Sequence, residues 1–203
     1  MRKIIYSILT LVMGLVLSGA GCKQDAYDPT FDKGVTINGV TWATRNVGEF
    51  GKFAATPEDA GMLYQWNRKT AYSATDPLTP AWNTEAISPT WNPDNDPCPV
   101  GWHVPTSTEM NTLADAANVD YAWEGSGGRF TDKAIPTNSI FLPVTHGRWF
   151  ANGGLVGGGT AGIYWTTWTN GSGVALGFHF NDVGSWTANY FYLYAHPIRC
   201  VKD

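Results

Sequence analysis

The stretch from Asp96 to Glu109 reads DPCPVGWHVPTSTE and contains the clearest structural signals of the 203-residue chain. Thr106, which follows Pro105, is a favourable helix N-cap, and Glu109 completes a Thr-x-x-Glu capping box. Apolar residues then recur at helical spacing, at positions 110, 113, 114 and 117. We therefore predict a helix over about 107–117.

Outside this helix, the sequence favours strands and loops. The pair Asn38-Gly39 lies between short apolar runs and predicts a hairpin with a two-residue turn. Residues 73–99 are rich in Pro, Asn, Asp and Ser, which predicts a long loop. Further β-rich runs follow at 141–144, 163–167, 175–180, 190–194 and 198–201. Because helix and strands mix irregularly, we predict a single α+β domain.

The N-terminus has the pattern of an export signal. Arg2 and Lys3 precede a nearly unbroken apolar run over residues 4–17, which is short for a membrane span. Small residues then lead to Cys22, and this arrangement resembles the lipobox of bacterial lipoprotein precursors, although Gly19 stands where a leucine is usual. The alternative is an ordinary secretory signal followed by an incidental cysteine.

The lipobox resemblance implies a chain in three parts. Residues 1–21 are then a cleaved signal peptide, and Cys22 carries a diacylglycerol and acyl chains such as palmitate. Residues 22–33 are polar and acidic and are expected to form a flexible tether, with a globular domain over 34–203. We expect a lipid-anchored protein of the bacterial outer membrane, facing the periplasm or the cell surface.

The composition of the mature chain excludes one class of partner. Removal of residues 1–21 takes away Arg2 and Lys3, so 13 − 2 = 11 basic residues remain beside 17 acidic ones. No cluster of Lys and Arg tracks a phosphate backbone, and we therefore expect no nucleic-acid partner.

The chain has three cysteines, at positions 22, 98 and 200. If Cys22 is acylated, Cys98 and Cys200 can pair in an oxidising compartment and close a loop of about 100 residues. The alternative is two free, buried cysteines.

Four blocks of the sequence resemble the Fibrobacter succinogenes major paralogous domain, a family of exported bacterial proteins. The blocks are Val40–Asn46, Asp96–Thr106 leading to Glu109, Gly162–Thr167 and Pro197–Asp203. The resemblance covers about residues 33–203. It implies a C-type-lectin-like fold, related to that of the formylglycine-generating enzymes. In such a fold we expect a small twisted antiparallel sheet with one or two helices and long loops, and the ends of the domain side by side. It also implies a disulfide between Cys98 and Cys200, and it implies no activity.

The sequence contains no motif that predicts an enzyme. No Gly-x-Ser-x-Gly or His-Glu-x-x-His motif occurs, and no pair of carboxylates stands out. The four histidines are scattered, and we interpret them as packed or surface residues. Asn181-Asp182 resembles one half of a lectin calcium site, but the other half is missing. We expect no catalytic residue, no metal and no cofactor, with calcium as the alternative.

Aromatic residues are the best candidates for ligand binding. We interpret Trp42, Trp102 and Trp165 as core residues. Other aromatic residues stand next to amide or basic side chains in expected loops or at strand ends, an arrangement that suits stacking against sugar rings or anchoring a protein. The candidate binding residues are Arg148, Trp149, Phe150, Asn152, Trp168 and Trp186. The alternative is that they also cover the sheet.

We therefore predict a non-catalytic recognition module, held to the membrane by its lipid, that binds a glycan or an envelope protein. The second candidate is a structural or assembly subunit of a surface appendage or uptake complex. The third is a hydrolase.

Overall fold

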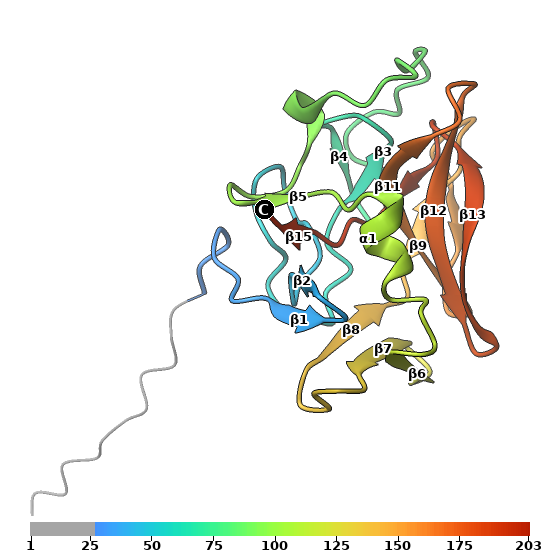
Figure 1. Cartoon of the computed structure of the whole chain (residues 1–203). Coiled ribbons are helices and arrows are strands. Elements are labelled where there is room, and N and C mark those ends of the chain that lie inside the picture. Colours follow the sequence, from blue (N-terminus) through green and yellow to red (C-terminus); the bar gives the residue numbers. More distant parts are fainter. Residues whose placement is uncertain (1–26) are drawn as a thin grey trace, which may run out of the picture.

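Short strands dominate residues 27–203, the part of the chain that the computed structural model describes (Figure 1). Strands account for 37% and helices for 5% of it, and the strands form four small antiparallel sheets. The predicted α+β domain of C-type-lectin-like type is therefore wrong, and the fold is mostly β. The predicted signal peptide and the lipidated Cys22 lie outside the described residues. Within residues 27–203, no helix is long and apolar enough to cross a membrane.

The two ends of the domain meet in the first sheet, whose strand order is β1-β2-β15-β5. Its strands are β1 (Val35–Ile37), β2 (Val40–Trp42), β5 (Trp102–His103) and β15 (Val201–Lys202). The predicted hairpin is confirmed: Asn38 and Gly39 have φ of 46° and 80°, the left-handed conformations that a tight hairpin turn requires. The expectation that the ends of the domain lie side by side is also confirmed.

A disulfide joins Cys98 to Cys200 beside this sheet, with the two Cα atoms 6.1 Å apart. The predicted pairing is therefore confirmed. Both cysteines belong to a buried cluster that includes Trp66, Trp102 and Trp165. The crosslink thus ties the long loop before β5 to the C-terminal end of the domain.

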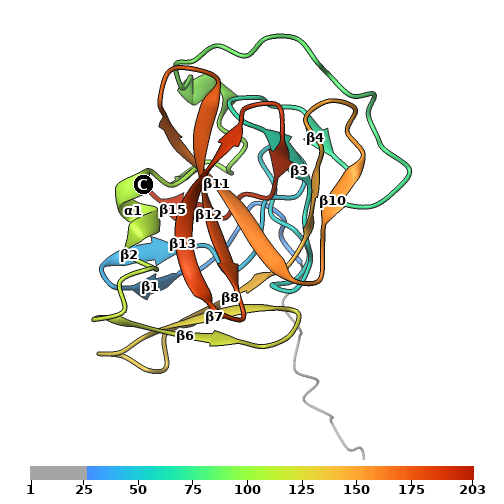
Figure 2. The ribbon, with the colours of Figure 1, turned by 90° about the vertical axis from the view of Figure 1, so that its right-hand side faces the viewer.

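The longest strands form two consecutive hairpins, which face the viewer in Figure 2. They are β11 (Ala161–Thr169), β12 (Val174–Asn181) and β13 (Gly184–Phe191). Neighbouring residues of a strand point to opposite faces of a sheet, so Phe178 and Phe180 of β12 enter one core while His179 lies on the other face. This sheet therefore separates two regions of the molecule.

Two further sheets cover its faces. On the side of Phe178 and Phe180 lies the sheet β6 (Val119–Trp123), β7 (Gly127–Asp132) and β8 (Ser139–Pro143). On the other side lies a sheet of order β10-β9-β14-β3-β4. Its strands are β3 (Leu63–Gln65), β4 (Ala71–Tyr72), β9 (His146–Arg148), β10 (Leu155–Gly157) and β14 (Ala195–His196).

The predicted helix begins where expected but is shorter. Helix α1 spans Ser107–Asn111, and both hydrogen bonds of the Thr106–Glu109 capping box are present. After Asn111 the backbone bonds become i to i+3, and the Asp115 carboxylate then accepts from the backbone N–H of Ala117. Because this side-chain bond stabilises a turn in place of another helical turn, the predicted extension to residue 117 is wrong. The predicted loop over 73–99 contains one short helix, η1 (Pro93–Asn95).

The start of the described chain packs on the domain, although it falls in the predicted tether. The carboxylate of Asp32 is buried and accepts hydrogen bonds from the backbone N–H and hydroxyl of Thr44 and from Arg45. The hydroxyl of Tyr27 donates to the carbonyl of Phe53 at 2.6 Å. Residues 27–33 are thus held by specific bonds.

Candidate functional site

A cavity of about 290 Å³ lies between the β11–β13 sheet and the strands β9, β10 and β14. We call it the aromatic pocket. It is lined by Thr145, Gly147, Trp149, Val156, Gly157, Gly158, Thr160, Ala161, Ile163, His179, Tyr190, Tyr194 and His196. Four aromatic or imidazole rings from β12, β13, β14 and the segment leading to β14 lie close together here. The ring centroids of Tyr190 and Tyr194 are both within 6 Å of that of His196.

Strand geometry brings these rings together. His179 lies on the face of β12 opposite Phe178 and Phe180, and Tyr190 comes from the neighbouring strand β13. A turn after β13 then carries the chain into β14, which pairs with β3 and β9. Tyr194 and His196 therefore reach the same cavity from its other wall.

His196 is the most buried polar side chain of the aromatic pocket, with 2% of its surface exposed. Its Nε2 atom makes no hydrogen bond with any described residue. Burial, together with the nearby His179, lowers the pKa of His196 to about 3. The imidazole is therefore uncharged at neutral pH, as its apolar surroundings require.

His179 is held from two directions. Its Nδ1 atom lies 2.9 Å from the Tyr190 hydroxyl, and its ring stacks on Trp186 with the centroids 4.4 Å apart and the planes at 15°. Burial lowers the pKa of His179, and burial raises the pKa of Tyr190 to about 12. Both groups are thus uncharged at neutral pH, and they form a fixed polar pair in the wall of the pocket.

Close packing under His196 depends on a glycine. A Cβ atom at Gly147 would lie 2.9 Å from Nδ1 and 3.0 Å from Cε1 of His196. Any side chain at position 147 would therefore push this ring out of its place. The absence of a side chain here brings strand β9 close to the histidine.

Exposed aromatic rings continue from the mouth of the pocket. Trp149 packs edge-on against Tyr194 at 5.3 Å, and Phe150 contacts Trp149, Tyr194 and Phe191. Trp149 is 39% exposed and Phe191 is 54% exposed. We call Trp149, Phe150, Phe191 and Tyr194 the aromatic platform. Trp149 and Tyr194 therefore belong both to the platform and to the lining of the cavity.

The structure brings some of the predicted binding residues together. Trp149 lies at the aromatic pocket, Phe150 belongs to the platform, and Trp186 reaches the pocket through its stacking on His179. Trp168 is 40% exposed but does not line the cavity. The exposed Asn152 caps the turn between β9 and β10 by accepting a hydrogen bond from the backbone N–H of Gly154.

Among the predicted binding residues, Arg148 has the position that differs most from the prediction. Its side chain is fully buried, and its guanidinium donates to the carbonyls of Ser73, Thr75 and Gly153 and to the carboxylate of Asp76. These bonds join the long loop that begins at residue 73 to strand β9. The predicted role of Arg148 in ligand contact is therefore corrected to a structural one. The predicted core residues Trp42, Trp102 and Trp165 are confirmed, with exposures of 0%, 8% and 1%.

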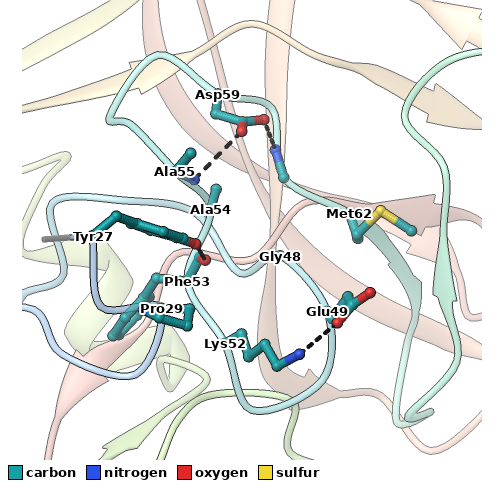
Figure 3. Close-up of a pocket in the computed structure, with 11 residues that line it drawn as sticks. Tyr27, Pro29, Gly48, Glu49, Lys52, Phe53, Ala54, Ala55, Asp59 and Met62 are labelled. Carbon is teal, nitrogen blue, oxygen red and sulfur yellow. Dashed lines mark hydrogen bonds and ion pairs between the residues drawn. The ribbon is translucent and has the colours of Figure 1, made fainter.

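A second hollow, of about 420 Å³, lies where the chain enters the domain (Figure 3). Its polar groups are already bonded to one another. Asp59 accepts from the backbone N–H groups of Ala55 and Gly61, and Lys52 pairs with Glu49 at 2.7 Å. Residues 27–29 and 48–62 supply its lining, and none of the predicted binding residues belongs to it.

Neither charge nor a metal cluster marks the aromatic pocket. Its lining contains no Asp, Glu, Lys or Arg. Among residues 27–203, no group of three or more His, Cys, Asp or Glu side chains is arranged to hold a metal ion. Asn181 belongs to the sequence that resembles half of a lectin calcium site. Its side chain accepts hydrogen bonds from the backbone N–H groups of Val183 and Gly184 and closes the β12–β13 turn.

Comparisons with protein-family models, with curated proteins and with solved structures found no match to this chain. The geometry of the pocket is therefore the basis for a functional assignment.

Sequence reasoning missed most of the pocket. Tyr190 and Tyr194 are not among the predicted binding residues, and the sequence pattern predicts His179 and His196 as packed or surface residues. A signal for them exists, because aromatic rings or imidazole stand at every second position from 190 to 196. However, the turn between β13 and β14 changes the direction in which these side chains point. Tyr192 stacks on Trp66 in the core, whereas Tyr190 and Tyr194 line the cavity.

Proposed function

We propose that this protein is a lipid-anchored recognition module of the bacterial cell envelope, and that its aromatic pocket binds glycans. The observation that carries the proposal is an uncharged cavity lined by Trp149, Tyr190, Tyr194 and two neutral histidines, open to a platform of exposed rings. The N-terminal pattern that ends at Cys22 supports export and anchoring. The resemblance of four sequence blocks to the Fibrobacter succinogenes major paralogous domain agrees with an exported bacterial protein.

The chemistry of a sugar matches this lining. The C–H faces of a pyranose ring are apolar and stack on aromatic rings, whereas its hydroxyls exchange hydrogen bonds with water for bonds with the protein. Tyr194 and Trp149 line the pocket, and each carries one polar group, a hydroxyl and an indole N–H. These are polar groups at the pocket that a ligand hydroxyl can engage.

A glycan array with the purified full-length protein tests this proposal. We expect binding to a limited set of glycans, which is lost in Trp149→Ala and Tyr194→Ala. Phe50→Ala is the matched control, since Phe50 is an exposed aromatic residue, 44% exposed, outside the pocket. Absence of binding to any glycan, or equal losses in all three variants, would refute the proposal.

A role as an assembly subunit is the second candidate, and the aromatic platform supports it. Exposed clustered aromatic rings also anchor protein partners. In that case Phe191→Ala should abolish co-purification of a defined envelope protein, while glycan binding is absent. Glycan binding that survives in Phe191→Ala would favour the first proposal.

A further inference from the structure

We propose that the aromatic pocket accepts a single uncharged sugar ring and rejects sugars that carry a carboxylate. This inference rests on the proposed function and deepens it, because it names the class of sugar that the pocket selects.

The charge of the lining is the first argument. All side chains that line the cavity are apolar, hydroxyl-bearing, indole or imidazole. Burial keeps both imidazoles neutral, since it lowers the pKa of His179 and of His196. The pocket therefore holds no cation that could pair with a carboxylate and no carboxylate that could pair with an amine.

The cost of an unpaired charge is the second argument. A carboxylate that leaves water for such a cavity loses its hydration and gains no counter-ion, and this loss is much larger than the small net change for a hydroxyl. Protonation of a buried histidine cannot compensate easily, because the same surroundings also disfavour a charged imidazole. A neutral ring and its matching uronic acid should thus bind very differently.

The size of the cavity is the third argument. Ligand pockets commonly measure about 300–1,000 Å³, and the aromatic pocket, at about 290 Å³, lies just below this range. It suits one ring rather than a bent oligosaccharide. The following sugar would then lie over the platform, where Phe191 and Tyr194 are parallel to within 3° with the centroids 6.5 Å apart.

Matched sugar pairs test the selectivity on the full-length protein. The probes are the methyl glycosides of glucose, galactose and mannose, their uronic acids, and the methyl esters of these acids, titrated at pH 7 with detection by ligand-observed NMR. We expect at least one neutral glycoside to bind and its uronic acid to bind at least about tenfold more weakly, because an unpaired buried charge costs more than the 1.4 kcal/mol that corresponds to a factor of ten. The methyl ester, which removes only the charge, should restore most of the affinity.

A pair of variants tests whether the neutral glycoside binds in the aromatic pocket. Val156→Trp places a large side chain in the lining of the pocket, and Val183→Trp places the same side chain on a residue that is 85% exposed and outside it. Only the first should abolish binding of the neutral glycoside, and circular dichroism should show that both variants fold. If Val156→Trp fails to fold, Tyr194→Ala replaces it as the pocket variant.

The outcomes separate the inference from the proposed function. Equal or tighter binding of the uronic acid, while a glycan array is positive, would overturn the selectivity and leave the function intact. Binding that survives in the pocket variant would overturn the location. If no glycoside binds and the array is negative, both the function and the inference are wrong.

Discussion

The hydroxyl of Tyr190 lies 2.9 Å from Nδ1 of His179, across the neighbouring strands β13 and β12. Burial raises the pKa of Tyr190 to about 12, so its hydroxyl keeps its proton at neutral pH. The contact orients the imidazole of His179, whose ring also stacks on Trp186. The place of this imidazole in the wall of the pocket is thus defined by contacts within the protein, and such preorganisation reduces the entropy lost on binding.

Trp149→Ala should weaken glycan binding by about 2 kcal/mol, the usual scale for a central aromatic anchor. Since Trp149 is 39% exposed, the loss of stability should be smaller than that of Trp165→Ala, for which about 3–5 kcal/mol is expected from a cavity at a fully buried site. Titration by tryptophan fluorescence and thermal unfolding measure the two effects. A large drop in melting temperature in Trp149→Ala, without a change in affinity, would contradict this prediction.

His196 should make the domain sensitive to acid. Its pKa is about 3 in the folded protein and 6.5 in the reference state, so between these values only the unfolded chain binds the proton. Above pH 6.5 the neutral His196 ring therefore has no effect on the pH dependence of stability. As the pH falls from 6.5 towards 3, the free energy of unfolding decreases by about 1.4 kcal/mol per pH unit. His196→Phe should flatten the dependence of the unfolding free energy on pH over this window.

His146→Gln is the control for this measurement, because His146 is exposed. His103 acts in the opposite direction: burial alone would lower its pKa, but bonds with Asp203 and Glu109 outweigh burial and raise it. Its contribution is present below pH 6.5 and is lost as the pH rises through the raised value, and it is the same in the wild type and in His196→Phe. Equal slopes in these two proteins would show that His196 is not responsible.

Arg148→Met should lower the free energy of unfolding by about 3 kcal/mol, because the carbonyls of Ser73, Thr75 and Gly153 lose their donor at once and each such bond contributes about 0.5–1.5 kcal/mol. The long loop that begins at residue 73 should also become easier to cleave by protease, since Arg148 joins it to strand β9. Urea unfolding and limited proteolysis measure these effects. Asn152→Ala, on the neighbouring exposed turn, should change stability by less than about 0.5 kcal/mol. Similar unfolding curves for the two variants would contradict the structural role of Arg148.

Replacement of both Cys98 and Cys200 by serine should lower the stability by about 4 kcal/mol. The reason is that the crosslink spans 102 positions and restricts the unfolded chain over that length. Peptide mapping without reductant should first find the two peptides joined in the exported protein. An unchanged midpoint of urea unfolding in the double variant would contradict the expected contribution.

Cys22 should carry the lipid anchor. Metabolic labelling with a fatty-acid probe should mark the wild-type protein and leave Cys22→Ala unlabelled. In cell fractionation, the wild type should follow the membranes and the variant the soluble fraction. Equal labelling of the two proteins would show that the lipid is attached elsewhere or is absent.

Features that depend on a few neighbouring residues were predictable from the sequence. The Asn38-Gly39 turn forms because these residues adopt positive φ more easily than others do. The capping box of Thr106 and Glu109 needs only a spacing of three residues. Core positions such as Trp165 and the pairing of the two domain cysteines were also predicted, the latter from cysteine number and from a family resemblance.

Only the tertiary structure decided the fold class, the length of the helix and the membership of the pocket. The helix ends early because Asp115 accepts a backbone hydrogen bond in a turn. Arg148 was predicted from its neighbours to face a ligand, but carbonyl groups more than 70 residues away bury it. The pocket combines residues of β9, β10, β12, β13 and β14, whose pairing depends on contacts across the whole chain. Local propensity acts over a few residues, whereas the placement of each ring depends on which distant strand pairs beside it, and this is why the sequence by itself determined the turns and caps while the tertiary structure determined the site.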